Sequence, residues 1–225
     1  MTELLTQKAK MRKSGGDQYS LWNFGIPAYK DSTGFRTCPN AAACVIGCYA
    51  KAGAYIWTPT VKAYEWRLAQ TKLNTFHTDM VAAINKKLKT ATRKGQQLVI
   101  RVHDSGDFYS LNYARTWLHI SHEFPTVRFY AYTKMVLMFR QLRFSEDIIG
   151  DNFTIIYSEG GKEDNFIRPT DRHSRVFLTD SALIEAGYDN ASKDDTVAFL
   201  SDSGKIGLVY HGVSSKQWKT GGKTS

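Results

Sequence analysis

The cysteines are the residues with the clearest potential for chemistry in this chain. All three, Cys38, Cys44 and Cys48, lie within one eleven-residue segment, CPNAAACVIGC. The alanine-rich run predicts a helix that begins at Pro39, because the first helical position needs no N–H donor. Cys44 and Cys48 would then share one helical face, with Cys38 folded back onto it. Since the positive field of a helix N-terminus favours thiolates, this pattern predicts a metal site.

Three interpretations of these thiols remain open. A [4Fe–4S] cluster held by three thiolates is preferred, and it leaves one iron for a side chain, a substrate or a cofactor. A zinc site comes second, with one of the six histidines as the fourth ligand. Simple packing of three small, semi-buried cysteines comes third. Full disulfide pairing within one chain is excluded, because the number of cysteines is odd.

A second group of polar residues follows the strand expected at residues 97–103. Packing does not require a polar run such as HDSGD at the end of a strand, whereas barrel-like folds place their chemistry there. His103 is a candidate acid, base or metal ligand, and Asp104 or Asp107 a candidate for binding a polar ligand group. For Asp107 the stronger explanation is the cap of a helix that begins near Tyr109, whereas for His103 and Asp104 a functional role is preferred.

Two more expected strands end in candidate site residues. The strand at 127–133 leads into Lys134, and Tyr132 and Lys134 either line a site or snorkel together at its rim. The strand at 152–158 ends in SEGG, where glycines permit close backbone approach to a ligand. Glu159 is a candidate partner for a ligand amine or ribose, with a plain turn as the alternative. The catalytic candidates are His103, Asp104, Asp107, Tyr132, Lys134 and Glu159.

Several segments together resemble the phage gene product 88-like family. They are NFGIPA from Asn23, the cysteine segment from Thr37 to Ala50, RVHDSGDF from Arg101 and FYAYTK from Phe129. The similarity covers about the first three quarters of the chain. It implies a small viral protein with an iron–sulfur site. Within this hypothesis, Asn23, Ser158, Gly160 and Gly161 are candidates for cofactor binding, and Cys38, Cys44 and Cys48 for the metal.

A looser resemblance links the cysteines to radical S-adenosylmethionine enzymes. Those enzymes hold a [4Fe–4S] cluster with three cysteines after the first barrel strand, usually spaced C-x3-C-x2-C. The spacing here is C-x5-C-x3-C. The resemblance implies that three cysteines hold the cluster and leave one iron open, and S-adenosylmethionine is a candidate ligand for that iron.

Composition bounds the remaining possibilities. The formal net charge is +9, which suits an anionic partner and leaves a basic nucleic-acid-binding protein with a structural metal as the alternative function. No apolar run reaches the length of a membrane span, and the polar N-terminus has no signal-peptide core. Reduced cysteines then favour the cytoplasm, meaning the host cytoplasm for a viral protein.

Strands that alternate with helices predict one α/β domain over residues 1–225 with a mainly parallel sheet. About five βα units are too few for a closed barrel, so we expect a partial or distorted barrel with a C-terminal β-hairpin. An open doubly wound sheet is the alternative. Residues 1–17 and 214–225 are expected to be flexible tails.

Overall fold

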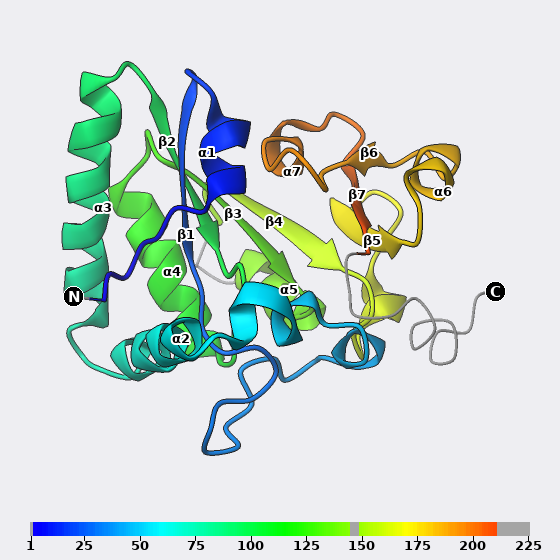
Figure 1. The fold of residues 1–225 in the computed structure, drawn as a ribbon, viewed down its shortest axis with the longest axis horizontal. Helices are drawn as coiled ribbons and strands as arrows, with labels where there is room; N and C mark the ends of the chain where they lie inside the picture. The colour runs from blue at the N-terminus through cyan, green and yellow to red at the C-terminus, as the bar shows by residue number, and fades with distance from the viewer. Residues whose placement is uncertain (1, 145–148, 211–225) are drawn as a thin grey trace.

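The computed structural model describes residues 2–144 and 149–210. Within them the chain forms an α/β fold around one seven-stranded sheet with the strand order β1-β2-β3-β4-β5-β7-β6. Every described strand pair is parallel. The sheet curls into a half-barrel (Figure 1), which confirms the predicted partial barrel rather than the doubly wound alternative.

The strands and helices have the following bounds. The strands are β1 (Tyr19–Phe24), β2 (Gln97–Val102), β3 (Arg128–Thr133), β4 (Phe153–Ser158), β5 (His173–Phe177), β6 (Asp189–Asn190) and β7 (Lys205–Val209). The α-helices are α1 (Ala9–Gly15), α2 (Thr58–Thr71), α3 (Phe76–Arg93), α4 (Leu111–Glu123), α5 (Val136–Phe144), α6 (Asp180–Glu185) and α7 (Val197–Leu200). Short 3₁₀ turns are η1 (Ala43–Val45), η2 (Tyr49–Lys51), η3 (Gly53–Ile56) and η4 (Asp164–Phe166).

Two apolar cores lie on opposite faces of the sheet, because successive strand side chains alternate between faces. The larger core packs Phe24 and Ile100 of the strands against Trp117 of α4 and the other long helices. The smaller core lies inside the curl, where Met11 of α1 and Phe199 of α7 pack on strand residues. The concave side of the half-barrel is therefore filled by two segments from opposite ends of the sequence (Figure 1).

The two ends of the chain differ from the sequence expectation. Residues 2–17 are not a loose tail, because Leu4 and Leu5 are buried and α1 joins the inner core. The prediction of a C-terminal β-hairpin is also wrong. Residues 197–200 are helical, and β7 lies parallel to both β5 and β6. Four apolar residues in a row fit a buried helix or a buried strand equally well, so the pattern could not separate them. The tail expected at 214–225 lies outside the described residues.

None of the described helices is both long enough and apolar enough to cross a lipid bilayer.

Candidate cysteine site

The carboxyl ends of β1 to β4 meet at one edge of the sheet, and the loops that leave them build the site. The loop after β1 carries the cysteines, and the loop after β2 carries residues 103–110. Lys134 follows β3, and Gly160 and Gly161 follow β4. Parallel strands with consecutive order bring these four loops together.

The cysteine loop is held by the loop after β4 rather than by a helix of its own. The backbone N–H groups of Ala42 and Cys44 both donate to the carbonyl of Gly160, at 3.2 and 3.1 Å. The segment is consequently a series of 3₁₀ turns, η1 to η3, and the predicted helix from Pro39 is wrong. Gly160 has φ +96°, and a Cβ built there would lie 3.1 Å from the Cβ of Cys44. A glycine is favoured here because a side chain would be strained at this φ and would press on Cys44.

The three thiols are free and partly buried. Burial is the main cause that raises the pKa of Cys38 to about 12, with the charge of Asp107 adding to it. Burial also raises the pKa of Cys48, and the charge of Cys44 raises it further. The expectation of thiolates stabilised by a helix N-terminus is therefore wrong for these two residues. The backbone N–H of Tyr29 donates to the sulfur of Cys38 at 3.3 Å, which is a weak opposing effect.

Asp107 and Lys134 tie the cysteine loop to β3. The buried Asp107 carboxylate accepts from the Thr133 hydroxyl at 2.6 Å and from the Lys134 backbone N–H at 2.9 Å. Its own N–H donates to the carbonyl of Thr37, the residue before Cys38. Asp107 is not the helix cap considered from the sequence, because Ser110 caps α4 through the N–H of Tyr113.

Lys134 stands between the cysteines and the end of β4. Its ammonium donates to the Ser158 hydroxyl at 3.0 Å, and its charge lowers the pKa of both Cys38 and Cys48. Its backbone carbonyl accepts from the Asn40 side chain at 3.4 Å. The structure thus brings together the sequence candidates Asp107, Lys134, Ser158, Gly160 and Gly161 around the cysteine loop.

His103 lies apart from this group, in the larger core. It has φ +67°, unusual for a residue other than glycine, and its ring packs on Phe24 and Phe108. Its Nε2 lies 2.9 Å from the hydroxyl of Tyr113, and burial lowers its pKa to about 3. The contacts described for His103 are those of a neutral core residue.

Asp104 is likewise engaged away from the thiols. Its carboxylate lies 2.5 Å from the Lys8 ammonium and accepts from the Tyr64 hydroxyl at 3.0 Å. Its carbonyl accepts from Tyr49, the residue after Cys48, at 2.5 Å. Asp104 therefore anchors the cysteine loop through its backbone, while its side chain fixes the N-terminal segment.

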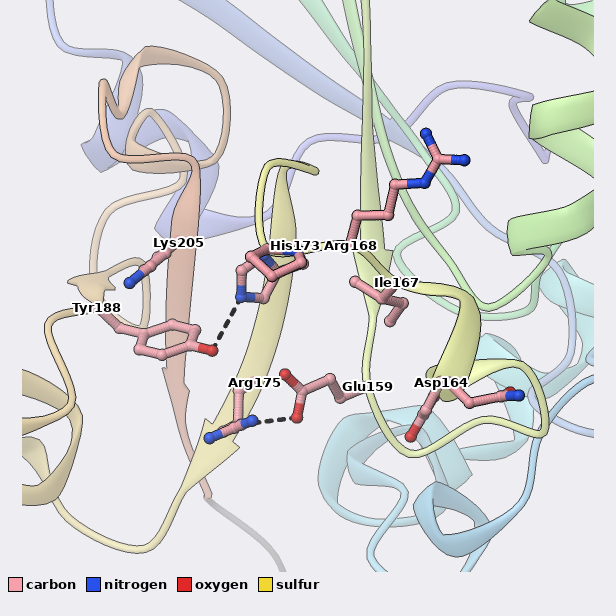
Figure 2. A pocket seen from close by; sticks show the side chains of 10 residues that line it. Glu159, Asp164, Ile167, Arg168, His173, Arg175, Tyr188 and Lys205 are labelled. Atoms are coloured by element: carbon pink, nitrogen blue, oxygen red, sulfur yellow. Dashed lines mark hydrogen bonds and ion pairs between the residues drawn. The ribbon is translucent and has the colours of Figure 1, made fainter.

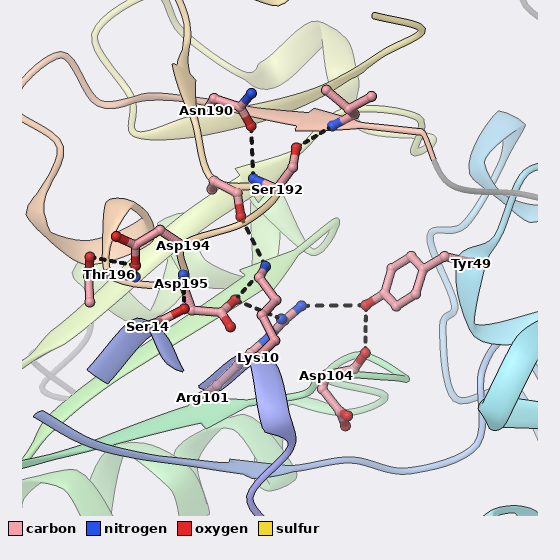
Figure 3. Close-up of polar contacts among 12 residues, drawn as sticks. Lys10, Ser14, Tyr49, Arg101, Asp104, Asn190, Ser192, Asp194, Asp195 and Thr196 are labelled. Atoms are coloured by element: carbon pink, nitrogen blue, oxygen red, sulfur yellow. Dashed lines mark hydrogen bonds and ion pairs between the residues drawn. The ribbon is translucent and has the colours of Figure 1, made fainter. Parts of the chain in front are cut away.

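A polar layer inside the curl was missed by the sequence reasoning (Figure 3). The half-buried Arg101 of β2 lies 3.4 Å from the Tyr49 hydroxyl and 3.6 Å from Asp195, which also binds Lys10 at 3.1 Å. The sequence signal that could have revealed this layer is the position of Arg101 within the apolar run of β2. Tyr132 belongs to this layer, because the Arg101 guanidinium lies 5.1 Å from its ring.

Asn23 is the register partner of Arg101 on β1, so both side chains share the concave face. Its side chain is fully buried, and neither amide atom has a hydrogen-bond partner among the described residues. Glu159 turns the other way, pairing with Arg175 of β5 at 2.6 Å beside a cavity (Figure 2).

The side chains as they stand are not arranged around a single ion. Within residues 2–144 and 149–210, no group of three or more His, Cys, Asp or Glu side chains is placed to hold one metal ion.

A family model described as gene product 88 matches residues 2–221. The chain belongs to this family. The Gene 88 protein of Mycobacterium phage L5 is 29% identical over 139 residues, covering 58% of this chain and 55% of that protein. The Gene 88 protein of Mycobacterium phage D29 is 28% identical over the same length and with the same coverage. The chain spans about half the length of these relatives.

No solved structure gives a significant match to the chain. The predicted resemblance to a phage family is confirmed by the family model and by both phage proteins. The looser likeness to radical S-adenosylmethionine enzymes stays a prediction.

Proposed function

We propose that this member of the gene product 88 family is an iron–sulfur protein that holds a [4Fe–4S] cluster through Cys38, Cys44 and Cys48. The observation that carries the proposal is the gathering of all three free thiols of the chain at the carboxyl edge of a parallel half-barrel. Their charges influence one another, and Lys134 influences two of them, so the three belong to one site.

The donor set fits a cluster better than a single ion. In a cluster each thiolate binds a different iron, so the sulfurs need not converge on one point. Both Cys38 and Cys48 have raised pKa values, so a strong Lewis acid must replace their protons. The Lys134 ammonium offsets part of the negative charge that three thiolates bring.

The fourth iron would be open to an exogenous ligand. Asp107 accepts three hydrogen bonds, from Phe108, Thr133 and Lys134, and one oxygen of Asp104 is paired with Lys8. His103 packs among core aromatic rings. A cluster with an open iron supplies Lewis-acid or one-electron chemistry, for which S-adenosylmethionine is one candidate ligand. The chain's own contribution is to hold the three thiolates and to place Lys134 and Ser158 beside them.

The test is the iron and acid-labile sulfide content of protein purified without oxygen. We expect close to four of each per chain, and a loss of most of both in Cys38→Ser, Cys44→Ser and Cys48→Ser. Ala43→Ser is the matched control, because Ala43 is exposed in the same loop and the change adds a serine without removing a thiol. Full cluster content in all three cysteine variants, or zinc alone in the wild type, would refute the proposal.

A second candidate function is the binding of nucleic acid at the rim of the same loop. The ring of Tyr29 is approached by Lys51 at 4.9 Å, Lys30 at 5.2 Å and Arg36 at 5.8 Å from its centroid. None of these three cations has a carboxylate partner in the described part of the chain. Uncompensated cations around an aromatic ring suit a phosphate backbone and a stacked base.

This candidate predicts binding of single-stranded DNA that weakens steeply with salt. Lys30→Gln combined with Lys51→Gln should reduce both the affinity and the salt slope. Lys86→Gln combined with Lys89→Gln on α3 is the charge-matched control. Binding that is insensitive to salt, or equal in the two double variants, would remove nucleic acid from consideration.

A further inference from the structure

A cavity of about 540 Å³ lies where the half-barrel lacks a covering helix (Figure 2). The connection from β4 to β5 contains only the 3₁₀ turn η4. By contrast, α4 connects β2 to β3 and α5 connects β3 to β4. β4 and β5 also pair through only two residue pairs, Tyr157–His173 and Ser158–Ser174. Leu183 of α6 packs against Gly207 on the helix-side face of β7, so the opening on that face lies between α6 and the connection.

The side chains that reach this opening follow from strand register. His173 is the register partner of Tyr157, a residue of the larger core, so His173 points to the helix side. Arg175 shares that face two residues later, and Lys205 of β7 is the partner of His173. One face of two adjacent strands thus presents three basic or titratable side chains to the cavity.

Part of this polar set is already paired. Arg175 binds Glu159 at 2.6 Å. His173 Nδ1 lies 2.8 Å from the carbonyl of Asp171, and since a carbonyl only accepts, Nδ1 carries the proton. In the neutral ring Nε2 then accepts from the Tyr188 hydroxyl at 2.9 Å. Asp164 also lines the cavity, and its carboxylate is occupied by the N–H groups of Gly160 and Gly161.

Two cations are left over. Arg168 enters from the β4–β5 connection and Lys205 from β7, and neither side chain has a described carboxylate or hydrogen-bond partner among residues 2–144 and 149–210. Asp171, the acid nearest in sequence to Arg168, pairs with Arg140 at 2.6 Å. The cavity therefore has an uncompensated positive charge. Ile167, Pro169 and the ring of Tyr188 add apolar surface to the same walls.

We propose that this cavity binds a small organic anion, with Arg168 and Lys205 contacting its charged groups from opposite sides and the ring of Tyr188 contacting its apolar part. The volume falls within the range of small-molecule sites, about 300–1,000 Å³. The cavity shares the loop after β4 with the cysteine site, but none of its lining residues is a cysteine. Binding there needs no cluster.

The experiment is isothermal titration calorimetry on the full chain with AMP, citrate and inorganic phosphate at constant ionic strength. AMP offers a phosphate ester and citrate offers carboxylates, so the two probes separate the two sources of negative charge. We expect one of them to bind at one site, at least about tenfold more tightly than inorganic phosphate, because the apolar walls contact only an organic ligand. The same affinity is expected in Cys38→Ser.

Lys205→Gln and Arg168→Gln should each weaken that binding about tenfold, the usual cost of losing one charge-assisted hydrogen bond. Lys89→Gln on α3 is the charge-matched control. Lys205 is exposed, so its variant keeps the test valid if Arg168→Gln does not fold. The proposal is overturned if neither organic anion binds, if inorganic phosphate binds as tightly, or if the Lys205 and Lys89 variants bind equally.

Discussion

Cys38 should be an unusually slow nucleophile in the metal-free protein. Burial and the charge of Asp107 raise its pKa from the ordinary 9.0 to about 12. At pH 8 the thiolate fraction falls from about one in ten to about one in ten thousand. A thiolate of higher pKa is intrinsically more reactive, which recovers about 16- to 30-fold at a Brønsted coefficient of about 0.4–0.5. Thiol–disulfide exchange should therefore be about 30- to 60-fold slower than for an ordinary thiol.

The assay is exchange with a small aromatic disulfide in a chain whose other cysteines are replaced, Cys44→Ser with Cys48→Ser. The same chain unfolded in urea supplies the reference rate. Asp107→Asn should accelerate exchange in the folded chain, because it removes a charge that opposes the thiolate. Asp17→Asn, at an exposed position, is the matched control.

Two results would refute this reasoning. Folded and unfolded chains that react within about threefold of one another would show that the pKa of Cys38 is not raised. A slow folded chain that does not respond to Asp107→Asn would mean that steric shielding, rather than electrostatics, protects the sulfur.

Three further predictions test the surroundings of the site. Because the folded-state pKa of His103 is lowered from 6.5 to about 3, the unfolded chain binds the extra proton, and stability should fall by about 1.4 kcal/mol per pH unit below pH 6.5. Urea unfolding at several pH values should show this slope disappear in His103→Asn; an unchanged slope would contradict it. Gly160→Ala should lower the melting temperature and the iron content by displacing Cys44, whereas Gly34→Ala, at φ +91° with nothing within 4 Å, should lose stability without losing iron. Equal iron loss in both would exclude the contact with Cys44 as the cause. Lys134→Gln should shift the reduction potential of a bound cluster to more negative values, because it removes a nearby positive charge; spectroelectrochemical titration would detect the shift, and an unchanged or more positive potential would contradict the assignment.

The local elements of this fold were largely readable from the sequence. A helix was predicted to begin near Tyr109, and α4 begins two residues later at Leu111, with Ser110 rather than Asp107 as its cap. Phe124-Pro125 ends the apolar periodicity after Glu123. The alternation of strands and helices also predicted a parallel sheet. Because parallel strands place their carboxyl ends at one edge, it followed that loops distant in sequence would meet there.

Tertiary structure decided what those loops do. The alanine-rich cysteine segment has helical propensity, yet its N–H groups bind the carbonyl of Gly160, which lies far along the chain. His103 and Asp107 are similar as sequence signals, but the left-handed backbone of His103 sends its ring into the core while Asp107 joins the cysteine loop. Sequence patterns report whether a residue is buried and in which local conformation. They do not report which distant backbone group will satisfy its hydrogen bonds, and that choice built this site.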